Sequence, residues 1–329
     1  MKTIFPQRIK YGSRVAIVAP ASSFEADELL VGLDLIKECG LKPVLGPCVK
    51  NVKSSFSHAG TVQARAAELN WAFSQPGISA ILCVKGGEGS AGLLPHLDYE
   101  AIKRSRRPFI GKSDITSLCN GIFFKTGLVT INGMSCSIHT KKGHDRFEKD
   151  CESLKYNLQL LMSEENWGTS PLLRNEFIPR TVSPGVAEGI ALGGNCDTFT
   201  RMLGTEFFPD TQDAILFLED THKEAESLAR QFLHLQLSGI LKKVKGVVLG
   251  EFFLEQPEKI KSKKCKLSID DVILEYFSDG APCSYGYSFS HGNIINPIPI
   301  GARCKLDATT GNVTFDFKMS SSAMGGLYI

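Results

Sequence analysis

The stretch PFIGKSDITSL, residues 108–118, places a serine where a nucleophile could stand. Ser113 follows Gly111 at the end of an apolar run that predicts a strand, and it precedes Asp114, where a helical pattern begins. A nucleophile elbow has this order, because a small residue before the corner leaves the hydroxyl exposed above the first free N–H groups of a helix. The full GxSxG pattern is absent, since Ile115 occupies the place of its last glycine. A simple helix N-cap at Ser113 therefore stays an alternative to a nucleophile.

A serine hydroxyl becomes an effective nucleophile only when a base accepts its proton, and histidine is the usual base. His291, in GYSFSHGNII, stands between aromatic residues and a glycine turn, in a loop that can project an imidazole into a cleft. His139, in SCSIHTKK, is a rival candidate. Glu219 ends the apolar strand AILFLED, where a buried carboxylate needs a partner and could orient an imidazole. Asp220 is an alternative orienting group, or the cap of the next helix.

The segment GGEGSAG, residues 86–92, is a glycine-rich turn after a predicted strand. It has neither the GxGxxG spacing of a dinucleotide site nor the Gly-Lys-Ser/Thr ending of a P-loop. Glu88 would also place a carboxylate beside any bound phosphate. Two interpretations remain: a plain tight turn, or a loop whose backbone N–H groups face a ligand as an oxyanion hole requires.

Apolar and amphipathic segments alternate through the first half of the chain. This order predicts strands buried on both faces, which is typical of a parallel sheet covered by helices. Ligands bind at the carboxyl ends of such strands, and the loops VKGGEGS and GKSD both fall there. Strands are expected near 14–20, 42–46, 80–84, 109–112 and 128–133, and helices near 25–40, 61–75 and 146–165.

A polar stretch with prolines, within residues 166–184, predicts a linker between a domain over 1–165 and a domain over 185–329. The second half contains AEGIALGGN, interpreted as a strand running into a glycine turn, and then the strand AILFLED, a helix over 223–239 and the strand VKGVVLG. Short alternating strands follow. The sequence therefore predicts a second, mixed α/β domain with a β-rich end.

Composition and charge exclude several broad classes of function. Of 329 residues, 43% are hydrophobic and 22% are charged, and 37 basic against 35 acidic side chains give a net charge of +2. No broad attraction to nucleic acid or to a membrane surface is expected. The N-terminus lacks the apolar region of a signal peptide, and no apolar run is long enough to span a bilayer. Several of the scattered cysteines lie inside apolar runs, and such buried, reduced thiols fit a cytoplasmic protein best. The ten cysteines form no CxxC pair and HExxH is missing, so no metal site is predicted.

The chain resembles the LD-carboxypeptidases, serine peptidases with a Ser-Glu-His triad that include murein tetrapeptide carboxypeptidases and microcin C self-immunity proteins. The resemblance runs in order through RVAIVAPAS, ARAAELNWAF, VKGGEGSAGLLPHLDYEAI, FIGKSDITSL, GGNCDTFTRMLGT, AILFLED, VKGVVLGEF and HGNIINPIPIGA. It implies that Ser113 is the nucleophile, His291 the general base and Glu219 its orienting partner. It also implies an oxyanion hole made by the backbone N–H groups of Gly87 and Asp114.

The resemblance also implies an architecture. Members of the family pair a flavodoxin-like or Rossmann-like N-terminal domain with a smaller C-terminal α/β domain. Their active site lies between the two domains, and homodimers are usual. A homodimer is therefore expected here.

This chain departs from the family pattern close to the expected site. Lys85 and Glu88 flank glycines where the family has Arg-Gly-Gly-Tyr-Gly, and Lys112 replaces an aromatic residue before the nucleophile. Cys196 replaces a leucine after GGN, and Ser290 replaces a glycine before the histidine. These changes bear on substrate preference, so Lys85, Glu88 and Lys112 are candidate substrate-binding residues. Glu88 and Lys112 both replace aromatic residues on neighbouring loops, and they are expected to face each other across the mouth of the cleft.

The activity that the resemblance implies is hydrolysis of an amide bond between an L-centre and a terminal D-amino acid. The expected substrate is a small peptide, cytoplasmic murein tetrapeptide in peptidoglycan recycling, from which D-alanine is released without a metal or organic cofactor. One alternative is a microcin-immunity type carboxypeptidase that cleaves a peptidyl nucleotide, although charged residues stand at 88 and 112 where an aromatic platform for the base is expected. Another is a non-catalytic protein that binds a peptide in the same cleft.

Overall fold

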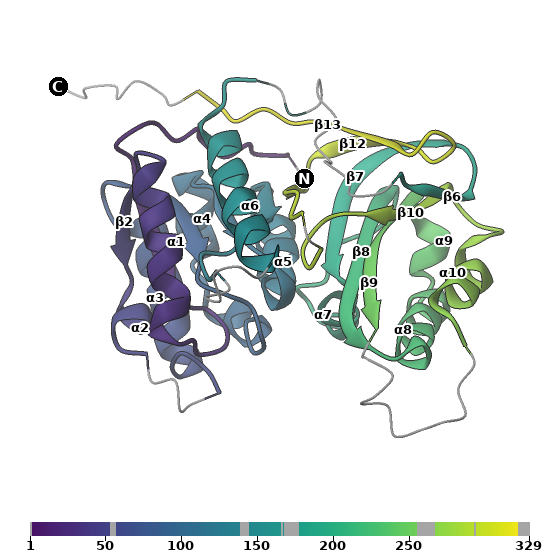
Figure 1. Cartoon of the computed structure of the whole chain (residues 1–329), viewed down its shortest axis with the longest axis horizontal. Helices are drawn as coiled ribbons and strands as arrows, with labels where there is room; N and C mark the ends of the chain where they lie inside the picture. Colours follow the sequence, from purple (N-terminus) through teal and green to yellow (C-terminus); the bar gives the residue numbers. More distant parts are fainter. Residues whose placement is uncertain are drawn as a thin grey trace.

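The structure of the chain, a computed structural model, describes residues 2–52, 57–138, 145–165, 167, 178–254, 267–292 and 294–321. Two β-sheets with their helices lie side by side (Figure 1). We call the six-stranded sheet with its helices the first lobe, and the seven-stranded sheet with its helices the second lobe. Buried hydrophobic side chains from both sheets belong to one core cluster, so the two lobes are packed against each other.

The first sheet has the strand order β2-β1-β3-β4-β5-β11. Its first five strands are parallel, in the flavodoxin-like order, and β11 pairs antiparallel with β5 at the edge. The apolar runs of β1, β3 and β4 are buried along almost their whole length, as a sheet covered on both faces requires. The strands are β1 (Arg14–Val18), β2 (Lys42–Leu45), β3 (Ile78–Cys83), β4 (Phe109–Gly111), β5 (Thr130–Asn132) and β11 (Ile298–Ile300).

Helices connect and cover these strands, and their ends follow local sequence signals. The Thr61 side chain accepts a hydrogen bond from Ala64 N at the start of α3, and Gly40 adopts a positive φ of 76° just after α1. The helices of the first lobe are α1 (Ala26–Glu38), α2 (Pro47–Lys50), α3 (Val62–Ser74), α4 (Tyr99–Ser105), α5 (Thr116–Thr126) and α6 (Asp145–Met162), with the 3₁₀ turns η1 (Ala91–His96) and η2 (Ser113–Ile115).

The second sheet has the order β13-β12-β7-β8-β9-β10-β6. Its four central strands, β7 to β10, are parallel, and β6, β12 and β13 are antiparallel. The strands are β6 (Arg180–Ser183), β7 (Val186–Asn195), β8 (Ala214–Lys223), β9 (Gly246–Leu254), β10 (Cys283–Tyr287), β12 (Arg303–Asp307) and β13 (Asn312–Asp316). The helices are α7 (Cys196–Arg201), α8 (Ala225–Leu237), α9 (Ile240–Lys243) and α10 (Ile269–Phe277). The expected fold class, a flavodoxin-like sheet followed by a mixed α/β unit with a β-rich end, is confirmed.

Two details differ from the sequence-based expectation. The glycines of AEGIALGGN do not form a turn, because β7 continues through Gly193 and Gly194 to Asn195. The short strand β11 comes from the second half of the chain, yet it completes the sheet of the first lobe. The division of the chain at 166–184 stays a prediction, and much of that segment lies outside the described residues.

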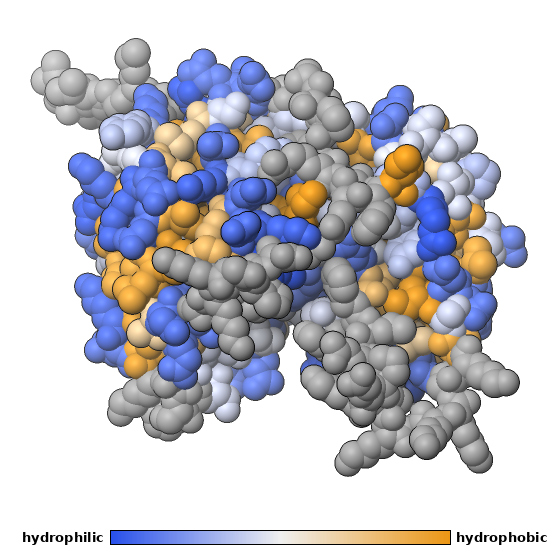
Figure 2. Space-filling model, in the orientation of Figure 1, coloured by the Kyte–Doolittle hydropathy of each residue, from blue (hydrophilic) through white to orange (hydrophobic). Residues whose placement is uncertain are grey.

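The surface carries both hydrophilic and hydrophobic residues. Hydrophobic residues gather over the first lobe around α1, where Leu30 is 60% exposed (Figure 2). Scattered exposed hydrophobic side chains are ordinary for folded proteins. Within the described part of the chain, none of the helices combines the length and the apolar character that a bilayer crossing requires.

Candidate active site

Ser113 occupies a strained corner between β4 and α5. Its φ angle is 62°, in the left-handed region that residues with a side chain rarely adopt. Glycines make room on both sides: a Cβ on Gly111 would lie 2.8 Å from Ile115 Cγ2, and a Cβ on Gly86 would lie 2.8 Å from Ser113 Cβ. The Ser113 side chain makes no capping hydrogen bond, and Lys112 occupies the N-cap position of η2. The N-cap interpretation is therefore wrong, and the corner has the geometry of an elbow.

The glycine-rich loop after β3 lies directly against this corner. Gly87 has a φ of 108°, and a Cβ there would lie 2.2 Å from Ser22 Oγ, so only glycine fits. Ser22 Oγ also accepts a hydrogen bond of 3.1 Å from Glu88 N. Buried Arg65 donates to Gly89 O over 3.0 Å and to Pro20 O, which fixes the far side of the loop.

Asp114 joins the corner to the loop. Its buried carboxylate accepts a hydrogen bond of 2.8 Å from Ser90 N, and Ser90 Oγ donates to Asp114 O over 2.7 Å. Burial raises the pKa of the Asp114 carboxyl, while the hydrogen bonds from Ser90 and the charge of Arg65 oppose this shift. Neither Gly87 N nor Asp114 N donates a hydrogen bond to a described residue, so both amides are available to a ligand.

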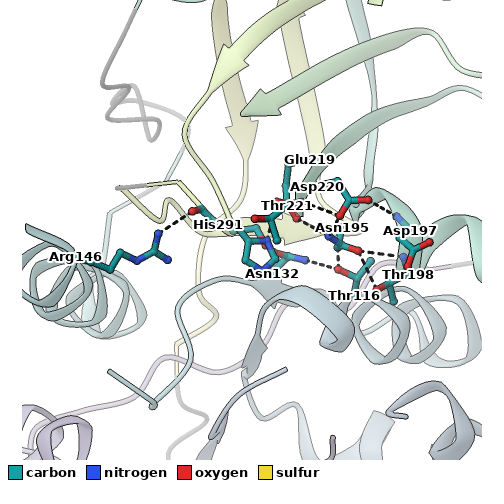
Figure 3. A network of polar contacts seen from close by, with 11 residues as sticks. Thr116, Asn132, Arg146, Asn195, Asp197, Thr198, Glu219, Asp220, Thr221 and His291 are labelled. Atoms are coloured by element: carbon teal, nitrogen blue, oxygen red, sulfur yellow. Dashed lines mark hydrogen bonds and ion pairs between the residues drawn. The ribbon is translucent and has the colours of Figure 1, made fainter. Parts of the chain in front are cut away.

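Glu219 and His291 form a pair across 72 residues of sequence. Nδ1 of His291 lies 2.8 Å from Oε2 of the completely buried Glu219 (Figure 3). Glu219 does not end its strand as expected: it is the last residue of β8 that pairs with β7, and β8 continues along β9 to Lys223. Asn195 Nδ2 donates to the other oxygen, Oε1, over 3.4 Å. A carboxylate at Nδ1 holds the N–H on that nitrogen and leaves Nε2 free to accept a proton.

Asp220 has a different role from the two that the sequence left open. Its carboxylate accepts hydrogen bonds from Asn195 Nδ2 (3.0 Å), from Asp197 N (3.2 Å) and from Thr221 N (2.8 Å). It therefore stabilises the start of α7, and Glu224 stands at the N-cap of α8. The imidazole of His291 contacts Glu219, and no hydrogen bond between it and Asp220 is found among the described residues.

A buried polar junction holds the two lobes in register near Ser113 and Glu219. Asn120 Nδ2 donates to Gly193 O over 2.8 Å, and Gly193 N donates to Asn120 Oδ1 over 3.0 Å. Thr116 Oγ1 accepts hydrogen bonds of 3.0 Å from Asn132 Nδ2 and from Asn195 N (Figure 3). A Cβ on Gly194 would lie 2.5 Å from Thr116 Oγ1, so the glycines of β7 permit this close approach.

The backbone of His291 is held by the first lobe as well. Arg146 Nη1, from α6, donates to His291 O over 3.0 Å (Figure 3). Arg146 Nε pairs with Asp150 at 3.0 Å. Ser290 has a φ of 60°, which explains why glycine suits this position in the family pattern. Sequence reasoning missed Arg146, Thr116 and Asn120. The i,i+4 spacing of Arg146 and Asp150 was the only available signal, and it predicts a helical ion pair rather than a contact with His291.

Ser113 and His291 line one pocket of about 330 Å³, together with Glu28, Lys85, Gly87 and Lys112. We call it the first pocket. Lys85 Nζ pairs with Glu28 Oε2 at 2.9 Å, and Ser137 Oγ donates to the same oxygen over 3.1 Å. Among the described residues, no hydrogen bond joins Ser113 Oγ to the imidazole of His291 in this conformation.

The expected pair of Glu88 and Lys112 is wrong. Glu88 is exposed and lines a second pocket of about 480 Å³, whereas Lys112 is partly buried in the first pocket. Loss of hydration on burial and the charge of Arg146 lower the pKa of Lys112 to about 8, while Asp150 and Glu219 oppose the shift. The loop of Gly87 separates the two residues, because Gly87 lines both pockets.

Two further expectations concern a rival catalytic base and a metal site. The rival base His139 lies outside the described residues. The described residues contain no group of three or more His, Cys, Asp or Glu side chains that could hold a metal ion.

Comparisons with known proteins agree with this architecture. The family model "LD-carboxypeptidase N-terminal domain" matches residues 15–133, and "LD-carboxypeptidase C-terminal domain" matches residues 188–306. Fold and matches together define a two-lobed α/β peptidase. Within that class, the chain belongs to the LD-carboxypeptidase family.

The relatives cover nearly the whole chain. The probable murein peptide carboxypeptidase of Bacillus subtilis is 30% identical over 98% of this chain and 99% of its own length. The Microcin C7 self-immunity protein MccF of Escherichia coli is 30% identical over 90% of each chain. Among solved structures, a MccF mutant in complex with adenosine monophosphate has a TM-score of 0.82 at 24% identity and covers 97% of this chain and 100% of its own. Muramoyltetrapeptide carboxypeptidase from Oxalobacter formigenes has a TM-score of 0.74 at 24% identity, covering 94% and 100%. These two structures support the fold alone.

Proposed function

We propose that this protein is a serine-type LD-carboxypeptidase that releases the terminal D-alanine from murein tetrapeptide in peptidoglycan recycling. One observation carries the proposal. Ser113, on a corner with a φ of 62°, lines the same pocket as His291, whose Nδ1 lies 2.8 Å from the buried Glu219. A hydroxyl, an imidazole and an orienting carboxylate are the three groups that serine acyl transfer uses.

In the proposed reaction, Ser113 Oγ attacks the carbonyl carbon of the scissile amide while His291 Nε2 accepts the hydroxyl proton. The N–H groups of Gly87 and Asp114 receive the oxyanion, and loss of one such donor typically costs about 10²–10³-fold in kcat. His291 then protonates the departing amine. Water repeats the cycle on the acyl-enzyme, with His291 again as the base. Because Ser113 Oγ and His291 are not hydrogen-bonded in this conformation, the proton transfer requires the two side chains to approach each other.

The substrate class rests on the relatives. Their names include a probable murein peptide carboxypeptidase and a murein tetrapeptide carboxypeptidase of Pseudomonas aeruginosa, 39% identical over 36% of this chain. The test is incubation of the purified protein with murein tetrapeptide, with mass spectrometry to detect D-alanine and tripeptide. Wild type should release D-alanine and Ser113→Ala should not. Equal release by both proteins, or release by neither, contradicts the proposal.

A peptidyl nucleotide is the second candidate substrate. The observation in its favour is the similarity to MccF together with Phe207, an aromatic residue that lines the second pocket. An aminoacyl sulfamoyl nucleoside tests it. Turnover of that compound above the rate for murein tetrapeptide would favour the immunity-type activity over the murein-type activity.

Three further parts of the proposal are tested separately. A serine-directed acylating probe should label wild type and not Ser113→Ala, and absence of labelling would favour a non-catalytic binding protein. We propose a homodimer, and light scattering on the purified protein measures its mass. We also propose a cytoplasmic location, which cell fractionation tests.

A further inference from the structure

Among the described residues that line the first pocket, Lys112 is a cation that has no ion-pair partner. Lys85 is paired with Glu28 at 2.9 Å, and Asp150 is paired with Arg146 at 3.0 Å. Lys112 also lines the pocket, but it makes no ion pair or hydrogen bond through its side chain to any described residue. A partly buried ammonium without a partner is costly, and an anionic ligand would compensate it.

Local structure keeps Lys112 beside the nucleophile. It directly precedes Ser113 in extended conformation, with φ −132° and ψ 177°, and its carbonyl oxygen accepts a hydrogen bond of 3.2 Å from Ile115 N. The pKa of about 8 leaves the side chain largely protonated at neutral pH. Lys112, Asp150 and His291 line the same pocket, so the ammonium and the imidazole share it.

The position of His291 indicates which part of the substrate enters this pocket. The group that protonates the departing amine must touch that amine, and His291 lines the first pocket and not the second. Gly87 lines both pockets, so the scissile carbonyl belongs at their junction. The departing amino acid then occupies the first pocket. Its terminal carboxylate carbon is separated from the scissile nitrogen by one Cα atom, or about 2.5 Å.

We propose that Lys112 is a specificity-determining residue that binds the terminal carboxylate of the departing amino acid. This inference rests on the proposed function and adds the reason why the enzyme acts at a free C-terminus. A charge-assisted hydrogen bond from the ammonium to the carboxylate would select a peptide acid over the corresponding amide. The acyl part of the peptide extends towards the second pocket, past Gly87.

The experiment compares murein tetrapeptide with its C-terminal amide. Both are given to wild type, to Lys112→Met and to Lys305→Met, a control that removes an exposed lysine from β12. Wild type and the control should prefer the acid by the same ratio of kcat/KM. In Lys112→Met this ratio should fall by about 10–100-fold, mainly through KM for the acid, since a hydrogen bond between two charged groups is lost.

A purely electrostatic effect of Lys112 on Glu219 and His291 would give a different result. It would change both substrates equally and leave the acid-to-amide ratio unchanged, which would overturn the proposal. Calorimetry with Ser113→Ala, alone and combined with Lys112→Met, measures binding of the same two peptides without turnover. If the combined variant keeps the preference for the acid, Lys112 is not the carboxylate receptor. If wild type releases no D-alanine, the proposed function fails, and the calorimetry still decides the role of Lys112.

Discussion

Asn120 of α5 and Gly193 of β7 exchange two hydrogen bonds from one lobe to the other. Asn120 Nδ2 donates to Gly193 O over 2.8 Å, and Gly193 N donates to Asn120 Oδ1 over 3.0 Å. The Asn120 side chain is completely buried. It forms hydrogen bonds with both the backbone N–H and the backbone C=O of Gly193, as the backbone of a neighbouring strand would. The relative position of Ser113, on the first lobe, and Glu219, on the second, therefore depends on this side chain.

Replacement of Asn120 by alanine should destabilise the protein. The variant leaves a buried N–H and a buried C=O of Gly193 without partners, and we expect a loss of about 2–4 kcal/mol in the free energy of unfolding. Urea unfolding of wild type and Asn120→Ala measures it. Asn51→Ala, which removes one exposed hydrogen bond to Pro47 O, is the control and should change stability by less than about 0.5 kcal/mol. Similar losses in the two variants would contradict the role given to the junction.

Glu219→Gln should lower kcat by about 10³–10⁴-fold with little change in fold. The amide is nearly the same size, but it does not favour the imidazole tautomer that has its N–H on Nδ1. The measurement is the steady-state rate of D-alanine release, with circular dichroism to compare the folds. Glu188→Gln removes an exposed carboxylate that pairs with Lys305 at 3.5 Å, and it should keep the wild-type rate. A rate for Glu219→Gln within tenfold of wild type would show that the carboxylate does not orient a catalytic base.

Ser113→Gly should be more stable than Ser113→Ala, although both should be inactive. Alanine keeps the Cβ that makes a φ of 62° costly, whereas glycine adopts this angle freely. The relief of about 1–2 kcal/mol is partly offset by the greater freedom of glycine in the unfolded chain, so a net difference of about 0.5–1 kcal/mol is expected. Chemical denaturation of the two variants measures it. A Ser113→Gly variant that is less stable than Ser113→Ala by about 0.5–1 kcal/mol would mean that the corner stores no backbone strain, because only the cost of glycine in the unfolded chain would remain.

The first sheet and the triad candidates could be predicted because their signals are local. Continuous apolar runs mark β1, β3 and β4, and a histidine beside a glycine turn or a carboxylate after a buried strand stands out on its own. The resemblance to a family then selected among the open alternatives. The fold class that followed from these patterns is confirmed.

The remaining features depend on contacts between distant segments. The glycines of AEGIALGGN predict a turn, whereas Gly193 and Gly194 continue β7 by pairing with β8 and leave room for Thr116. The sequence of β11, which is three residues long, does not indicate that this strand pairs with β5 in the first sheet. The prediction of a Glu88–Lys112 pair is wrong because the two side chains line different pockets. The sequence shows that the two loops are neighbours, but it does not show on which side of its loop each side chain lies.

The burial of Lys112 predicts a pH dependence of stability. Its pKa is lowered from 10.5 to about 8 in the folded protein, so above about pH 8 the folded state binds fewer protons than the unfolded state. Stability therefore rises with pH between about 8 and 10.5 through this group, and the cost of the buried charge is fully present below about pH 8. Lys112→Met removes that cost. It should be more stable than wild type at neutral pH, and its advantage should shrink as the pH rises above about 8.

Urea unfolding of both proteins at several pH values measures the difference, and the same series with Lys305→Met corrects for groups that titrate elsewhere. An advantage that stays constant over this range would show that the Lys112 ammonium is well hydrated in the folded protein.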